Sequence, residues 1–277
     1  MSSAYAALVL DIDGTLLNEQ EQVPARTLQA IERARAAGVV VMLATGRSHK
    51  GVREIALQLE LDTPCVVFNG AAVYDARRDQ LLEQYWLPPD AVSTLLDFAQ
   101  AEALLPVVSR PEAQRVRTPR EDERELLGRF RNLEIVPFEA LPRSEALRVT
   151  LFSTRHPDSA ALHAQVVQAM AGRPAYYTHF ALAALVGFRE SDAQVVDVQP
   201  ACQGKAEALR VLAERHGITA ERVVAVGDAG NDIPILLAAG LGVAMGNATP
   251  ETKLAARRVI GDNDSHALAE LIEELFL

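Results

Sequence analysis

Residues 6–17 read AALVLDIDGTLL, and this stretch decides the fold. The apolar run Ala6–Leu10 ends at Asp11, Asp13 and Gly14, which is typical of a buried strand of a parallel sheet followed by a turn. Ligands of open α/β sheets bind just beyond the carboxyl ends of such strands. The stretch therefore predicts two carboxylates at the edge of the sheet where ligands bind. Taken alone, the two aspartates fit an Asx-turn, in which each side chain caps its own backbone, about equally well.

Strand and helix patterns alternate through the rest of the first eighty residues and again near the end of the chain. A helical pattern from Pro24 ends at Gly38, and the apolar segments 39–44 and 65–68 are two further buried strands. Segment 222–226 has the same character. Repeated strand–helix units with short connections predict an α/β fold with a doubly wound parallel sheet, as in Rossmann-like domains.

The pattern changes between residues 82 and 190. Helix-like and strand-like segments of a different character follow one another there: 90–104, 107–109, 147–153, 157–170 and the apolar run 182–188. We therefore expect a core domain made of residues 1–81 and 191–277, into which an α+β domain of residues 82–190 is inserted.

Composition limits the function. The chain has 277 residues, 49% of them hydrophobic, and a net charge of −10, which disfavours nonspecific binding to nucleic acid polymers or anionic membranes. No apolar stretch approaches the roughly 18 residues that span a bilayer. The start of the chain lacks the basic and apolar regions of a signal peptide, and only two cysteines occur. We expect a cytoplasmic protein without membrane or nucleic acid partners. The sequence does not indicate an oligomeric state.

Polar residues follow several of the predicted strands or open a helix on the same side of the sheet. They are Asp11, Asp13, Thr45, Lys205, Asp228, Asn231 and Asp232. Carboxylate oxygens at one sheet edge suit Mg²⁺, and a lysine with a hydroxyl group suits phosphoryl oxygens. Each residue alone has a simpler interpretation, such as a helix cap for Thr45 or a surface charge for Lys205. Their joint occurrence favours a site.

The sequence does not match other metal-binding or catalytic motifs, because the residues that they require are absent at the required spacing. An EF-hand loop beginning at Asp11 would need glycine at Leu16 and glutamate at Gln22. The sequence contains no Walker-type phosphate loop, no G-x-S-x-G nucleophile elbow and no H-E-x-x-H zinc motif.

These motifs resemble those of the haloacid dehalogenase-like (HAD) superfamily, in particular its Cof-type phosphatases. The resemblance rests on Asp11–Leu17, Ala44–Arg47, Asn69–Ala71, Lys205 and Gly227–Asp232, which span nearly the whole chain in the family's order. One departure occurs at Lys205, which is followed by Ala206 where these proteins often have glycine. Pro200 keeps its usual offset from the lysine.

The resemblance implies a role for each acidic residue. Asp11 would attack phosphorus and form an aspartyl-phosphate, while Asp13 would protonate the leaving group and then activate water. Mg²⁺ would be bound by Asp11, by the backbone carbonyl of Asp13 and by Asp228. Asp232 would bind the ion through a water molecule or hold the ligands that surround it.

The resemblance also implies phosphate and substrate contacts. Thr45, Lys205, Asn231 and the backbone N–H groups of Ile12 and Gly46 would bind the phosphoryl group. Arg47 and Asn69 are candidates for substrate contact. The inserted domain would be a cap that sets specificity.

We therefore expect a Mg²⁺-dependent phosphomonoesterase that acts on a small phosphorylated metabolite, such as a sugar phosphate, a nucleotide or a cofactor phosphate. A phosphomutase remains an alternative, because it needs the same pair of aspartates. A non-catalytic sensor of phosphate and metal is a less favoured one. The natural substrate and the cap residues that select it are not predicted.

Overall fold

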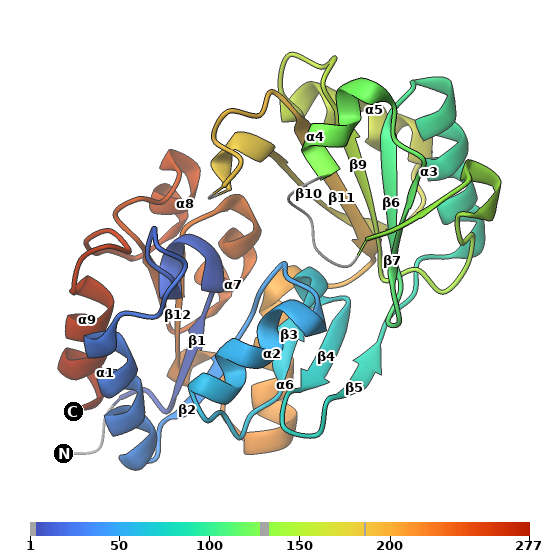
Figure 1. Cartoon of the computed structure of the whole chain (residues 1–277). Helices are drawn as coiled ribbons and strands as arrows, with labels where there is room; N and C mark the ends of the chain where they lie inside the picture. The colour runs from blue at the N-terminus through green and yellow to red at the C-terminus, as the bar shows by residue number, and fades with distance from the viewer. Residues whose placement is uncertain (1–3, 128–132, 186) are drawn as a thin grey trace. The chain divides into compact units, whose positions relative to one another are not determined.

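The computed structural model describes residues 4–127, 133–185 and 187–277 (Figure 1). The chain divides into two compact units. The first, the core unit, consists of Met1–Glu83 and Gln203–Leu277, and the second, the inserted unit, consists of Gln84–Cys202.

A five-stranded parallel sheet with the order β14-β13-β12-β1-β2 forms the centre of the core unit. Its strands are β1 (Ala7–Leu10), β2 (Val40–Leu43), β12 (Val223–Gly227), β13 (Leu241–Ala244) and β14 (Arg258–Val259). A smaller sheet contains β3 (Cys65–Val67), β4 (Ala72–Asp75) and β5 (Gln80–Gln84), and a parallel bridge from Ala44 to Val66 connects it to the end of β2. Apolar β1 therefore lies between two parallel neighbours, as its continuous burial requires.

Helices cover this sheet on both faces. They are α1 (Ala25–Ala36), α2 (His49–Gln58), α6 (Glu207–His216), α7 (Ile233–Ala238), α8 (Pro250–Ala255) and α9 (Ala267–Phe276). Val9 packs in one apolar cluster with Val211 of α6 and Leu236 of α7. On the other side, α1 and α9 lie together, and Arg26 forms ion pairs with two glutamates of α9 (Figure 1). The predicted α/β class with a parallel sheet is confirmed.

The inserted unit contains a six-stranded sheet with the order β10-β11-β9-β6-β7-β8. Its strands are β6 (Leu105–Ser109), β7 (Gln114–Arg117), β8 (Leu133–Val136), β9 (Arg148–Ser153), β10 (Ala175–Ala181) and β11 (Gln194–Pro200). Neighbouring strands of this sheet are antiparallel, except that β7 and β8 are parallel. Its helices are α3 (Pro89–Ala101), α4 (Arg124–Leu127) and α5 (Ser159–Met170), and α3 and α5 bury one face of the sheet.

Residues 191–202 belong to the inserted unit and not to the core, where the prediction from sequence puts them. The reason is the pairing of β11, which lies between β9 and β10 in the second sheet. Strand β11 is buried along its whole length like a core strand, and its antiparallel partners place it in the inserted unit. Within the described ranges, every helix is too short or too polar to cross a membrane.

Candidate active site

Three adjacent strands of the core sheet each end at a residue of the predicted site. Asp11 follows β1, Asp228 follows β12, and Thr45 lies two residues beyond the end of β2. Because Leu10 pairs in parallel register with Val226, the carboxyl ends of β1 and β12 coincide. The sheet therefore brings these side chains to one edge, which is where ligands of open α/β sheets bind.

The turn after β1 is built around close contact with Asp228. Gly14 has a φ of +73°, and a Cβ atom placed on it would lie 2.4 Å from Asp228 Oδ2. A side chain at this position would therefore be strained and would also displace the carboxylate. The Thr15 hydroxyl donates a hydrogen bond to Asp228 Oδ1 at 3.2 Å. The Asn247 amide donates one to the carbonyl oxygen of Gly14 at 2.8 Å.

Lys205 is buried beside two carboxylates. Its side chain is 1% exposed, and its ammonium group donates to Asp11 Oδ1 at 2.6 Å and to Asp232 Oδ1 at 2.7 Å. A buried ammonium group is stable only with such partners. Lys205 is therefore part of the site and not the surface charge that its position in the sequence alone would suggest.

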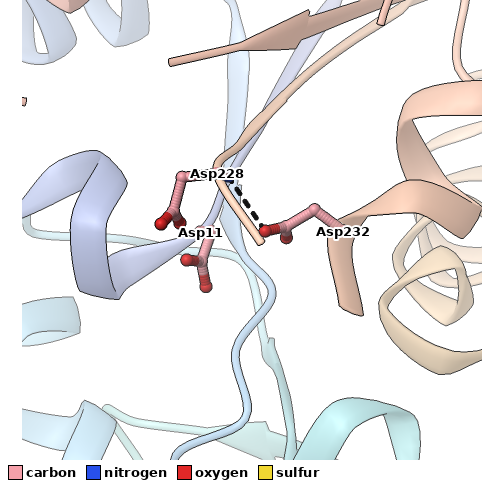
Figure 2. Close-up of side chains that lie close together, drawn as sticks. All are labelled: Asp11, Asp228 and Asp232. Carbon is pink, nitrogen blue, oxygen red and sulfur yellow. Dashed lines mark hydrogen bonds between the residues drawn. The ribbon is translucent and has the colours of Figure 1, made fainter. Parts of the chain in front are cut away.

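Asp232 is held on both of its oxygens. Its Oδ2 accepts a hydrogen bond from the backbone N–H of Asp228 at 3.1 Å (Figure 2). The same oxygen accepts one from the backbone N–H of Ala229 at 3.0 Å, and Lys205 donates to Oδ1. A Cβ atom on Gly227 would lie 2.2 Å from the Asp232 carboxyl carbon, so only glycine leaves room for this arrangement. Asp232 therefore fixes the loop after β12 and orients Lys205.

Asp11, Asp228 and Asp232 together form a compact acidic group. One potential ligand atom from each lies within 4.8 Å of the others, and their carboxylates gather at one place in Figure 2. Burial raises the pKa of Asp11 well above its ordinary value. Burial and the neighbouring charge of Asp232 raise the pKa of Asp228 to about 7.

The charges of this group fit a divalent cation. Burial alone would lower the pKa of Lys205, but the carboxylates of Asp11 and Asp232 outweigh it and raise that pKa. Lys205 is therefore charged and balances one carboxylate, so that two negative charges are left when all three aspartates are ionised. Oxygen ligands with this charge fit a hard divalent cation such as Mg²⁺.

The side chain of Asp13 lies outside this acidic group and pairs with Arg47. The Arg47 guanidinium group donates from Nε to Asp13 Oδ2 at 2.8 Å and from Nη2 to Oδ1 at 2.5 Å. The backbone N–H of Arg47 donates to the Thr45 hydroxyl at 3.1 Å, which fixes the start of the loop. Two parallel hydrogen bonds between guanidinium and carboxylate restrict orientation as well as distance.

The remaining predicted residues lie around the same strand ends. Asn231 donates to the side-chain oxygen of Asn69 at 3.0 Å, and Asn69 is buried in a left-handed conformation with a φ of +50°. The Asn69 backbone N–H donates to the carbonyl oxygen of Thr45 at 3.0 Å. Gly46 faces Asn69, because a Cβ atom on it would lie 3.1 Å from the Asn69 amide oxygen. Ile12 is fully buried.

Comparison with known proteins identifies the family. The sequence matches the family of haloacid dehalogenase-like hydrolases over residues 8–272. The chain belongs to this family. It is 29% identical to the 5-amino-6-(5-phospho-D-ribitylamino)uracil phosphatase YitU of Bacillus subtilis, over 97% of both chains. It is 28% identical to the pyridoxal phosphate phosphatase YbhA of Escherichia coli, over 96% of both chains.

Solved structures of HAD proteins have the same fold. A HAD-superfamily phosphatase from Bacteroides thetaiotaomicron superposes with a TM-score of 0.80 at 24% identity, and the match covers 98% of this chain and 95% of that one. The resemblance to Cof-type HAD proteins and the expectation of a HAD-like phosphatase are confirmed.

Two residues of this HAD-like hydrolase contribute to the site although the sequence analysis did not select them. Thr15 binds Asp228, and Asn247 binds the turn at Gly14. Thr15 lies inside the motif Asp11–Leu17, but a threonine in a turn does not by itself indicate a contact with a distant carboxylate. Asn247 follows β13, the next parallel strand beyond β12, so the rule that polar residues follow strand ends could have indicated it.

Proposed function

We propose that this HAD-like hydrolase is a Mg²⁺-dependent phosphomonoesterase that forms an aspartyl-phosphate on Asp11. The observation that supports this most is the position of Asp11 at the end of β1, hydrogen-bonded by buried Lys205 and close to two further carboxylates. In this proposal, an oxygen of Asp11 attacks phosphorus and the bond to the leaving oxygen breaks. Lys205 orients the Asp11 carboxylate for that attack.

Asp13 would be the acid and base of the reaction. It would give a proton to the leaving alkoxide and then take one from the water that hydrolyses the aspartyl-phosphate. Inorganic phosphate would leave and Asp11 would be restored. The bidentate contact with Arg47 supports a positioning role for this arginine, since it holds both carboxylate oxygens of Asp13.

The metal would be bound by Asp11, Asp228 and the backbone carbonyl of Asp13, with Asp232 binding through water. Mg²⁺ at this position would neutralise negative charge on the phosphoryl group. Thr45, Lys205, Asn231 and the N–H groups of Ile12 and Gly46 would bind the phosphoryl oxygens, in keeping with the backbone and amide contacts around Asn69.

The substrate would be a small phosphorylated metabolite, as the names of the two relatives state for those proteins. We propose that the inserted unit is a cap that selects the leaving group. Asn69 and Arg47 would contribute on the core side, although both already have protein partners in the structure.

A trapping experiment tests this proposal. The purified protein with Mg²⁺ is first screened for phosphate release across sugar phosphates, nucleotides and cofactor phosphates, with excess EDTA as the control. Asp13→Asn is then mixed with p-nitrophenyl phosphate, whose leaving group needs no proton. We expect a burst of p-nitrophenol and a phosphoryl group on the peptide that contains Asp11, detected by mass spectrometry. Release that is insensitive to EDTA, or a label on another residue, would contradict the proposal.

A further inference from the structure

Three consecutive residues of the core unit have a left-handed backbone. Phe68, Asn69 and Gly70 follow β3, with φ values of +51°, +50° and +96°, and we call them the left-handed turn. Glycine adopts such angles freely and asparagine tolerates them, but they are rare for a bulky residue such as phenylalanine. All three residues are buried. Backbone strain of this kind persists only where surrounding contacts hold it, and it gathers at functional sites.

The side chain of Phe68 anchors the left-handed turn in the interior. It is 1% exposed, and the centroid of its ring lies 6.2 Å from that of His49, the first residue of α2. The His49 ring in turn meets the ring of Tyr74 on β4 edge-on, at a centroid distance of 5.4 Å. This packing buries a large aromatic side chain, and its burial offsets the unfavourable backbone angle. The left-handed turn is therefore a fixed part of the core unit.

Two consecutive N–H groups of the left-handed turn bind the loop after β2. The N–H of Phe68 donates to the carbonyl oxygen of Arg47 at 2.9 Å, and the N–H of Asn69 donates to that of Thr45 at 3.0 Å. In an extended strand, successive N–H groups point to opposite sides, so the left-handed backbone is what directs both groups to one loop. The two accepting residues flank Gly46 in the sequence. The left-handed turn therefore fixes the backbone on both sides of Gly46.

The side chain of Asn69 reaches a second loop of the site. Its Oδ1 accepts a hydrogen bond from Asn231 Nδ2 at 3.0 Å, across 162 residues of sequence. An asparagine amide has two N–H donors, so this bond uses one, restricts the rotation of the Asn231 amide and leaves the other donor for a phosphoryl oxygen. Glycine would fit a left-handed backbone at least as well as asparagine. The contact with Asn231, and not the backbone angle, therefore accounts for an asparagine at position 69.

We propose that Asn69 is a positioning residue, which directs the Asn231 amide toward the phosphoryl group. The inference rests on the proposed phosphatase function and on the role of Asn231 in it. Donors that are fixed before the reaction stabilise the charge of the transition state without having to reorganise. This role differs from a direct contact between Asn69 and the substrate, because it disappears when the Asn231 amide is removed.

The test is a double-mutant cycle of Asn69→Gly and Asn231→Ala, in which kcat/KM is measured for p-nitrophenyl phosphate with Mg²⁺. Asn69→Gly removes the amide and suits the left-handed backbone. We expect it to lower kcat/KM by about tenfold in the wild-type background, the equivalent of one hydrogen bond of ordinary strength. In the Asn231→Ala background, the same change should lower kcat/KM by less than about twofold, because the group that Asn69 positions is absent.

Inhibition by inorganic phosphate gives a second measurement, since this ion probes the phosphoryl site alone. Its inhibition constant should rise in Asn69→Gly and in Asn231→Ala, and the double variant should show no further rise. Glu60→Gly is the matched control, because Glu60 is an exposed residue of the core unit with a φ of +52°. It should leave both quantities unchanged. Thermal unfolding checks the fold of each variant.

The outcomes separate this inference from the proposed function. An equal loss of kcat/KM in both backgrounds, as a direct substrate contact of Asn69 predicts, would overturn the inference, and so would no loss in the wild-type background. If Asn231→Ala leaves kcat/KM unchanged, the inference fails and the phosphatase function stands. If the wild-type protein does not hydrolyse p-nitrophenyl phosphate, the proposed function fails and this inference fails with it.

Discussion

The two units place polar side chains on their sheets in different ways. In the core unit, β1 and β12 are buried along their whole length and polar residues begin only after each strand ends. In the inserted unit, β9 and β11 carry polar residues between apolar ones, on the face opposite α3 and α5. A parallel sheet that helices cover on both faces has room for polar functional groups only at the ends of its strands. An antiparallel sheet that α3 and α5 cover on one face can carry polar side chains on its other face.

Asp11→Asn should have the largest effect, because it removes the proposed nucleophile from the strand end. We expect phosphate release to fall by about 10⁴-fold or more. The free energy of unfolding should not decrease, because burial already raises the pKa of Asp11 and disfavours its charged form. Phosphate release and urea unfolding measure the two effects. Asp97→Asn on α3 is the exposed control, and activity of Asp11→Asn above about one hundredth of wild type would contradict the assignment.

Lys205→Met should destabilise the core unit as well as abolish activity. It leaves Asp11 and Asp232 without their shared cation, and breaking a buried ion pair costs about 3–5 kcal/mol of unfolding free energy. Urea unfolding provides the measurement, and exposed Lys50→Met is the control. A loss below about 1 kcal/mol, as for a surface ion pair, would show that the lysine is not a structural part of the strand ends.

Glu123→Gln tests the corresponding buried charge of the inserted unit. Glu123 is 3% exposed and accepts hydrogen bonds from Arg117 at 2.7 and 2.8 Å and from Arg120 at 2.6 Å. We expect a loss of about 1.5–3 kcal/mol, the range for hydrogen bonds to charged groups. The loss should be the same with and without Mg²⁺, because this carboxylate lies in the other unit. The control is Glu134→Gln, at an exposed position of the same unit. A loss of stability that Mg²⁺ reverses would contradict the prediction that the two units carry independent buried charges.

A smaller effect should appear in the pH dependence of the metal-free protein. The pKa of Asp228 is about 7 in the folded state and near 3.8 in the unfolded state, so between these values the folded state binds more protons. Stability should therefore fall as pH rises from 5.5 to 8, by about 1–2 kcal/mol. Urea unfolding in EDTA measures this slope, and Asp228→Asn should reduce it.

Mg²⁺ should act in the opposite direction, because it binds the ionised carboxylates. Its stabilising effect should be larger at pH 8 than at pH 5.5. A metal-free protein that becomes more stable across this pH range would contradict the assignment of the acidic group.

Much of the core could be predicted from sequence because its strands are uniformly apolar and end in distinctive turns. The segment around Asp11 and the loop from Gly227 to Asp232 illustrate this. The inserted unit was harder to predict. Strand β10 contains aromatic and polar residues at an edge of the sheet, and β11 mixes valines with polar residues, so pairing between distant segments decides both places.

Contacts within the site could be predicted only in part. The parallel register brings strand ends together by a general rule, which is why Asp11, Asp228 and Thr45 could be grouped. The pairing of Arg47 with Asp13 depends instead on the path of the loop after β2, and no local pattern encodes that path.

The pairing of β1 with β12 also has a consequence for synthesis of the chain. Asp11 is made early, yet its hydrogen-bonding partner Lys205 follows 194 residues later, and Asp228 and Asp232 come later still. During translation, the first strand therefore has only β2 as a partner on one side until the last third of the chain emerges. A prematurely terminated chain has the first aspartates but neither the lysine nor the other carboxylates. Enzymatic competence is thus tied to completion of the polypeptide, and contacts so distant in sequence are expected to make folding slow.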